Sequence, residues 1–154
     1  MTVNVTPVDV SRITAAVKDQ LLRFPALEGV TIARSEEQNL INGVTPFVGV
    51  YRLGVRYAQR VLGFGGGVRD QRVRMLVLIA ESDMASGEAC EEKLEALIQN
   101  VVAAILSDTT LGGTVNAIED FDVSYESYSK ASNLYTQTAA LQFVAVGNTT
   151  ATQS

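Results

Sequence analysis

The sequence predicts an α+β fold, with one mainly antiparallel β-sheet of about four to five strands and two main helices packed against it. Residues 86–107 place apolar side chains at helical spacing, with glutamates on the other face. Other stretches, above all residues 72–80, alternate apolar side chains at the period of a strand. Because an apolar helix face needs a surface to bury it, we expect the long helix to lie on the sheet.

The chain length fits one domain. With 154 residues, 47% of them hydrophobic, the chain is long enough for a single core. We place this domain at residues 1–147 and expect residues 148–154 to be a flexible C-terminal tail, because they are polar and end the chain.

The first elements follow from local signals. Thr6 and Pro7 predict a helix start, because Thr is a good N-cap and Pro is tolerated in the first turn. Apolar residues then recur at helical spacing until Phe24-Pro25 ends the helix. We expect a short strand over residues 29–33, an exposed loop over 34–46 and strands over 47–53 and 72–80.

Residues 54–71 are predicted to form a long β-hairpin arm. Its centre, Gly63-Phe64-Gly65-Gly66-Gly67, has the glycine content of a phosphate-binding loop. However, it lacks the Gly-Lys-Ser/Thr ending, and a strand follows it where a phosphate site needs a helix N-terminus. We therefore interpret the glycines as a hairpin tip.

The second half begins with the long helix, which we expect Ser86 to cap. Gly112-Gly113 predict a tight turn, followed by strands over residues 114–128 and 134–146. In the first of these strands, alternation places Phe121, Val123 and Tyr125 inward, and puts three carboxylates on the outward face. These are Asp120, Asp122 and Glu126.

Charge is unevenly distributed. The segment 52–74 holds six arginines and one acid, a net charge of +5, so the rest of the chain carries −10 within the total of −5. Three interpretations are open for the arm: phosphate binding with stacking on Tyr51 and Tyr57, a solvated hairpin, or docking on acids of another copy. We favour docking, because an acidic body repels DNA. The candidate contacts to another subunit or another partner are Arg52, Arg56, Tyr57, Arg60, Phe64, Arg69, Arg72, Asp120, Asp122 and Glu126.

The composition argues against an enzyme. The chain has no histidine, which excludes Ser-His-Asp and Cys-His sites, and its single cysteine, Cys90, is interpreted as a packing residue. The three outward carboxylates are able to bind a hard cation, but a hydrated strand face is much commoner. We predict no catalytic residues, no metal site and no cofactor. No apolar run approaches the ~20 residues of a membrane span, and the start shows no export signal.

The segment around the glycine turn resembles a known family. Ile105-Leu106-Ser107-Asp108, then Leu111-Gly112-Gly113-Thr114-Val115, and a final strand ending at Val146 are similar to tail-completion proteins of tailed bacteriophages, the tail terminator or head-tail joining proteins. The motif covers Ser107 to Val115, and the order of elements agrees over the whole chain. The glycine-tipped arm has no counterpart among the family motifs.

This resemblance implies a structural virion protein, made in the host cytoplasm and located in the tail or neck. It implies a homohexameric ring that caps the tail tube, contacts the tube protein and presents a surface to the head connector, with the sheath and other neck proteins as further partners. It implies no catalysis, no cofactor and no membrane contact, and a lumen through which DNA passes without sequence-specific binding. Alternatives are another neck or tail component and a nucleic-acid-binding module that uses the arginine arm.

Overall fold

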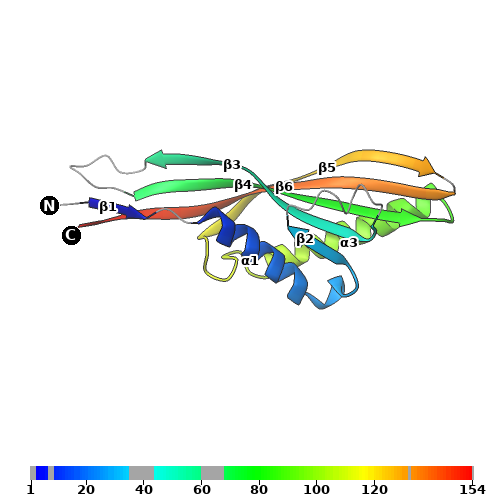
Figure 1. Cartoon of the computed structure of the whole chain (residues 1–154), viewed down its shortest axis with the longest axis horizontal. Helices are drawn as coiled ribbons and strands as arrows, with labels where there is room; N and C mark the ends of the chain where they lie inside the picture. Colours follow the sequence, from blue (N-terminus) through cyan, green and yellow to red (C-terminus); the bar gives the residue numbers. More distant parts are fainter. Residues whose placement is uncertain (1–2, 7–8, 35–43, 60–67, 132, 154) are drawn as a thin grey trace.

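The structure is a computed structural model that describes residues 3–6, 9–34, 44–59, 68–131 and 133–153, with side chains over 9–34, 44–57, 71–131 and 133–147. Six strands, two α-helices and one short 3-10 helix are found in these residues (Figure 1). In chain order they are β1 (Val3–Thr6), α1 (Val10–Arg23), η1 (Pro25–Leu27), β2 (Thr31–Arg34), β3 (Phe47–Gln59), β4 (Val68–Asp83), α3 (Gly87–Leu106), β5 (Ala117–Ala131) and β6 (Leu134–Gln153).

All six strands belong to one sheet. Its order is β1-β6-β4-β3-β2, and β5 also pairs with β6. Every neighbouring pair is antiparallel except β2 and β3, which are parallel. The predicted α+β class, with one mainly antiparallel sheet and two helices, is therefore confirmed, with six strands in place of the expected four to five.

Strand β6 is the centre of the sheet and is longer than predicted. One of its edges pairs with β4, and the other pairs first with β5 and then, over residues 150–153, with β1. The prediction that the last strand ends at Val146 is therefore wrong, since β6 continues to Gln153. The polar residues of this segment gain a ladder partner from the N-terminus, so the two ends of the chain lie together (Figure 1).

The start of the first helix also differs from the prediction. Thr6 belongs to β1, and the helix begins at Val10 with Asp9 as its N-cap. The Asp9 carboxylate accepts a hydrogen bond from the backbone N–H of Ser11 at 2.9 Å, which satisfies one of the orphan donors of the first turn. The predicted end is confirmed, because Phe24 is the C-cap.

The predicted arm is an extension of the whole sheet. Strands β3 and β4 remain paired as far as Gln59 and Arg69, as a hairpin arm requires. However, β4 also pairs with β6 in this region, where Val68 lies opposite Thr150, and β6 pairs with β1. The extension therefore contains four strands in place of two. Its tip lies outside the described residues, and with it Arg60, Phe64 and the glycine run.

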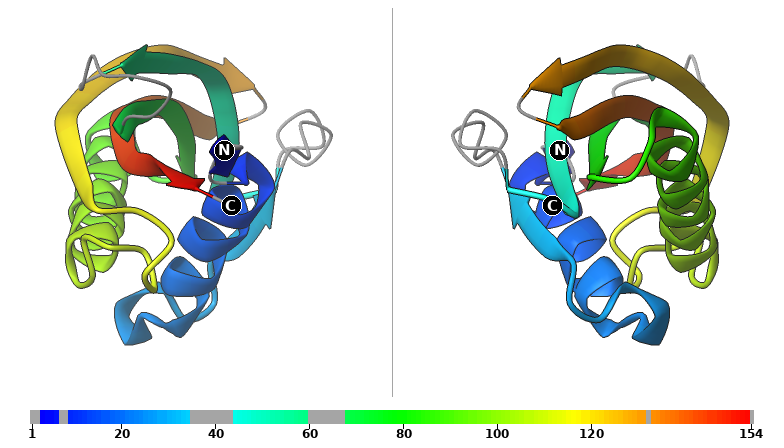
Figure 2. Two further views of the ribbon diagram at one scale, coloured as in Figure 1. Left: turned by 90° about the vertical axis from the view of Figure 1, so that its left-hand side faces the viewer. Right: turned by 90° about the vertical axis from the view of Figure 1, so that its right-hand side faces the viewer.

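The core lies between the sheet and the two helices, which cover the same side of the sheet (Figures 1 and 2). We call this the helix face of the sheet, and the opposite side the outer face. Val73, Met75, Val77 and Ile79 alternate along β4 and are fully buried, as their spacing predicts. The helices contribute Ile13, Val17, Leu21, Leu94, Val101 and Ile105 to the same cluster.

Both ends of α3 are stabilised by polar side chains. At the start, the Ser86 hydroxyl accepts a hydrogen bond from the backbone N–H of Ala89 at 3.0 Å, so the predicted N-cap is confirmed. At the end, buried Gln20 of α1 donates from Nε2 to the carbonyl oxygens of Ala104, Ile105 and Asp108, at 2.9, 2.8 and 3.0 Å. Gln20 thus satisfies carbonyl groups that a helix C-terminus leaves without partners.

The predicted glycine turn follows. Leu111, Gly112 and Gly113 have φ values of 48°, 68° and 84°. Two of these three left-handed positions hold glycine, which has no Cβ to clash there. The chain thereby turns from α3 back to the sheet.

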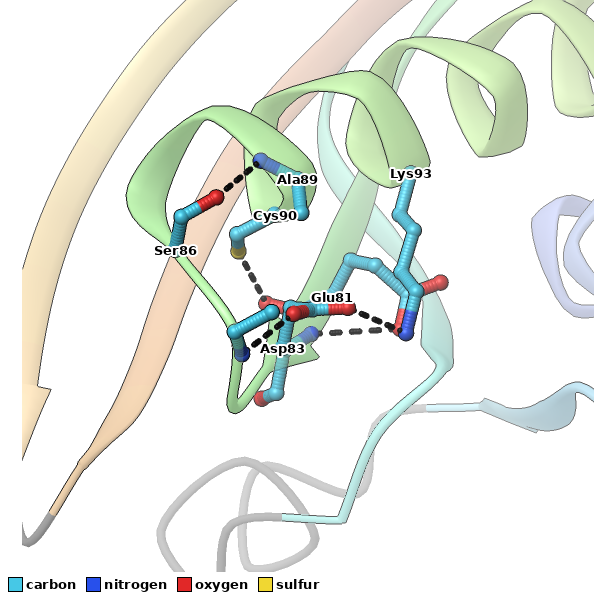
Figure 3. A network of polar contacts seen from close by, with 8 residues as sticks. Glu81, Asp83, Ser86, Ala89, Cys90 and Lys93 are labelled. Atoms are coloured by element: carbon cyan, nitrogen blue, oxygen red, sulfur yellow. Dashed lines mark hydrogen bonds and ion pairs between the residues drawn. The ribbon is translucent and has the colours of Figure 1, made fainter.

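A polar network lies at the start of α3 (Figure 3). Lys93 Nζ lies 2.7 Å from Asp83 Oδ2, and the backbone N–H of Ala85 donates to Asp83 Oδ1. The buried Cys90 thiol donates to the carbonyl oxygen of Glu81 at 3.3 Å. Burial raises the pKa of Cys90, which disfavours the reactive thiolate. These contacts agree with a packing role for this cysteine.

The Asp83–Lys93 pair makes stability depend on pH. The hydrogen bond from Lys93, and then that from Ala85, hold the pKa of Asp83 below its ordinary value of 3.8. The native state therefore binds fewer protons than the unfolded state, so the contribution of Asp83 is present at neutral pH and is lost as pH falls below 3.8. We expect Lys93→Gln to unfold more easily than the wild type at pH 7, and this difference to shrink towards pH 3.

Urea unfolding of both proteins between pH 7 and pH 3 measures this difference. Lys18→Gln on α1 is the matched control, because it removes one lysine without touching Asp83. A Lys93→Gln deficit that stays constant down to pH 3 would contradict the assignment to Asp83.

Candidate assembly surfaces

The outer face of the sheet collects Arg56 of β3 and Arg72 and Arg74 of β4. Arg72 and Arg74 alternate with the buried residues of β4, and Arg56 lies directly opposite Arg72 on β3. A Cβ on Gly54 would lie 3.1 Å from Nη2 of Arg74, so the glycine lets this guanidinium lie close against the β3 backbone. A surface hollow of about 440 Å³ is lined by these groups, namely Gly54, Val55, Arg56, Arg72, Arg74, Asp120 and Val144.

Arg72 reaches across β6 to the acids of β5. Its Nη2 lies 2.8 Å from Glu119 Oε2 and 3.6 Å from Asp120 Oδ2. The groups are between one third and three quarters exposed, so the pair contributes no more than about 1 kcal/mol to stability. We predicted Arg72 and Asp120 as contacts to other molecules, and the structure pairs them with each other within the chain.

The predicted regular face of three carboxylates is wrong, because β5 is interrupted by two β-bulges. One lies between Glu119 and Asp122, where Asp120 has a φ of 58°, and the other lies at Glu126. Each bulge adds one residue to β5 and shifts the alternation of its side chains. Only Asp122 keeps a regular position, exposed and opposite Gln142.

The remaining predicted contacts lie near the far part of β3. Arg52 is on the helix face, where its Nη1 donates to the hydroxyl of Ser11 at the start of α1 at 3.3 Å. Tyr57 is 53% exposed opposite Gln71. The backbone of Arg69 pairs with Gln59 and Thr149, and its side chain lies outside the described part. Arg52, Arg56 and Tyr57 are thus brought onto one strand, as predicted, but on both of its faces.

A second surface was not predicted from the sequence. The β5–β6 hairpin and the first half of α3 enclose a hollow of about 520 Å³ whose lining is acidic and aromatic. The hydroxyl of Tyr125 donates to Glu95 Oε1 across it. The lining residues are Glu91, Glu95, Tyr125, Glu126, Ser127, Tyr128, Gln137 and Thr138.

This second surface was missed because of the bulge at Glu126. The expected inward position of Tyr125 is on the correct face, opposite buried Ala139, but the residue is 61% exposed because no described strand lies on the other side of β5. The bulge then places Tyr128, three residues later, on the same face, where its hydroxyl lies 2.9 Å from a Cβ built on Gly87. A bulge in an exposed strand without glycine leaves no clear signal in the sequence.

These surfaces offer ion pairing, aromatic contact and backbone hydrogen bonding. Within the described ranges, no group of three or more cysteine and acidic side chains is placed to hold a metal ion. None of the helices described in the structure is long and apolar enough to cross a membrane.

The fold and these surfaces define a class, a single-sheet α+β domain with charged surfaces on one sheet. Comparison with known proteins found no family model and no curated protein that matches this chain.

Proposed function

We propose that this chain is a structural virion protein of a tailed bacteriophage, which forms a ring that terminates the tail tube and joins it to the head connector. The observation that supports this proposal most is the separation of charge across the sheet. Exposed Arg56 and Arg74 lie towards the β3 edge, and exposed Asp122 and Glu126 lie on β5 at the opposite edge. Copies arranged head to tail bring unlike edges together, and such contacts form a ring when the rotation closes.

The elongated sheet also supports a role in assembly. At 3.3 Å per residue, the 20 residues of β6 span about 65 Å, whereas the 20 residues of α3 span only about 30 Å. The sheet therefore extends well beyond the helix layer at the end where the two termini lie (Figure 1). In a ring, this extension is available to contact the tail tube or a neck protein.

The experiment that tests this function measures mass in solution across a concentration series, with negative-stain images of the same samples and of added tail tubes. We expect rings of about six subunits, or a cap at one end of the tubes. A strict monomer that ignores the tubes would contradict the proposal.

One observation favours a second candidate, a nucleic-acid-binding module. Exposed Arg56 and Arg74 lie together on the outer face of the sheet, where two guanidinium groups suit contact with phosphates, while exposed Tyr57 lies on the opposite face of β3. This function requires DNA affinity that falls steeply with salt. A fluorescence anisotropy titration with single-stranded and duplex DNA at 50 and 200 mM salt separates it from the ring, whose lumen needs no tight DNA binding.

A further inference from the structure

We infer that neighbouring copies in the ring join by strand pairing, with the free edge of β3 in one copy aligned against β5 of the next. The sheet then continues from subunit to subunit. This inference rests on the proposed function, because it specifies the contact that holds the ring together.

Both strands have an unpaired edge in the described part of the chain. Strand β2 covers β3 only along residues 47–50, so the outer edge of β3 from Arg52 to Gln59 has no described strand beside it. Strand β5 pairs with β6 on one side along its 15 residues, and no described strand lies on its other side. Such edges present rows of N–H and C=O groups that readily pair with another chain.

The outer faces of the two edges are complementary in charge. On this face, β3 presents the exposed guanidinium of Arg56, next to Arg74 of β4. The same face of β5 presents the exposed carboxylates of Glu119, in the row of Gly54 and Arg74, and of Asp122 on the other side of the bulge. Opposite charges on neighbouring strands stabilise a sheet, and like charges destabilise it. The pairing of β3 with β5 is therefore favoured over β3 with β3 or β5 with β5.

The helix faces of the two edges carry apolar residues, with Arg52 at one end of the β3 edge. On β3, Val55 is 38% exposed and Tyr57 is 53% exposed, on the side where the helices lie. On β5, Ile118, Phe121 and Val123 are half-buried on the same side and pack against the core. Joining the strands therefore aligns apolar residues on one face and opposite charges on the other.

The two edges also bend at the same level of the sheet. The bulge of β3 lies at Leu53, between the rows of Met75 and Arg74. The first bulge of β5 lies opposite Phe143, the residue that pairs with Met75. Because both edges bend at the same row, the two strands stay aligned when they pair side by side.

Strand direction fits a ring as well. Each of the three steps from β3 to β4, β6 and β5 is antiparallel, so β3 and β5 of one copy run in opposite directions. Rotation about an axis along the strands preserves direction, so β3 meets the β5 of the next copy antiparallel. That is the arrangement of every pair in this sheet except β2 with β3.

Hydrogen exchange of the backbone amides tests this inference directly. The wild-type protein is measured above and below the concentration at which rings form. We expect outward-pointing amides of Arg52–Gln59, and of a segment of similar length within Ala117–Ala131, to exchange at least about tenfold more slowly in the ring. Rings in which either edge exchanges as fast as in the monomer would overturn the strand pairing but would still support the proposed function. A protein that never forms rings would contradict both the strand pairing and the proposed function.

A charge-reversal pair adds a second test. Arg56→Glu with Arg74→Glu is expected to lose ring assembly in negative-stain images while keeping the wild-type circular dichroism spectrum. The matched control is Arg12→Glu with Lys18→Glu on α1, which changes net charge equally and is expected to keep the rings. Rings formed by the first variant, or lost equally in the control, would each contradict a contact between the arginine edge and the acidic edge.

Discussion

Replacing Phe143 by alanine is expected to lower the free energy of unfolding by about 3–5 kcal/mol, the largest effect on stability that we predict. Phe143 is 1% exposed on the helix face of β6, which pairs with strands on both sides. Its ring stacks on that of Phe121 at a centroid distance of 5.4 Å. Truncation therefore removes a buried aromatic side chain and the partner that covers Phe121 at the first bulge of β5.

Urea unfolding, at a protein concentration where the protein is monomeric, measures this loss without a contribution from assembly. Gln142→Ala is the matched control, because Gln142 is the exposed neighbour of Phe143 on the same strand. We expect this control to change stability by no more than about 0.5 kcal/mol. A Phe143→Ala protein as stable as the control would contradict the assignment of Phe143 to the core.

The second large effect is expected for Gln20→Ala, which we predict to lower the free energy of unfolding by about 2–4 kcal/mol. Gln20 is 5% exposed and its Nε2 is the donor shared by three backbone carbonyls at the end of α3. Without it, these buried or partly buried oxygens lose a hydrogen bond that water does not fully replace. Unfolding in urea measures the loss, and Gln99→Ala on the exposed side of α3 provides the control.

Gln20→Glu distinguishes the lost donor from lost packing. The substitution keeps the size of the side chain, but an ionised carboxylate faces carbonyl oxygens and has no hydrogen to donate. Burial beside these oxygens raises the pKa of the new carboxyl, so the native state binds more protons and the stability of Gln20→Glu rises as pH falls. A Gln20→Glu protein with wild-type stability at pH 7 would show that the donor does not matter.

The two effects have a consequence for function. Phe143 lies at the row where both sheet edges bend, and Gln20 holds the end of α3 against α1. Neither residue lies on the surfaces that we propose for assembly. Loss of rings in these variants is therefore expected only when the domain itself unfolds, whereas the arginine reversals act on a folded domain.

Predictions based on local periodicity were largely confirmed. The N-cap at Ser86, the end of the first helix at Phe24 and the alternation of Val73 to Ile79 all depend on residues close in sequence. Such features arise from backbone sterics and from the period of each element, and both are written in neighbouring residues. The candidate site residues on β3, Arg52, Arg56 and Tyr57, were chosen because their charge and aromatic character stand out in composition alone, and their role stays a prediction.

The features that were missed depend on residues far apart or on backbone geometry. Strand β1 and the end of β6 pair although about 150 residues separate them, and neither segment is apolar enough to stand out. The bulges of β5 occur at Asp120 and Glu126, where no glycine marks them. They broke the expected row of acids and created the hollow beside Tyr125.

By itself, the sequence determined the α+β class, the two helices with their apolar faces, and the uneven charge along the chain, because each follows from local spacing and composition. Only the tertiary structure decided which charges meet. Arg72 and Glu119 are 47 residues apart in the chain. They meet because β6 pairs with β4 on one side and with β5 on the other. The free edges of β3 and β5 were likewise decided by strand order, since an edge is defined by the strands that pair beside it, and these come from the whole chain.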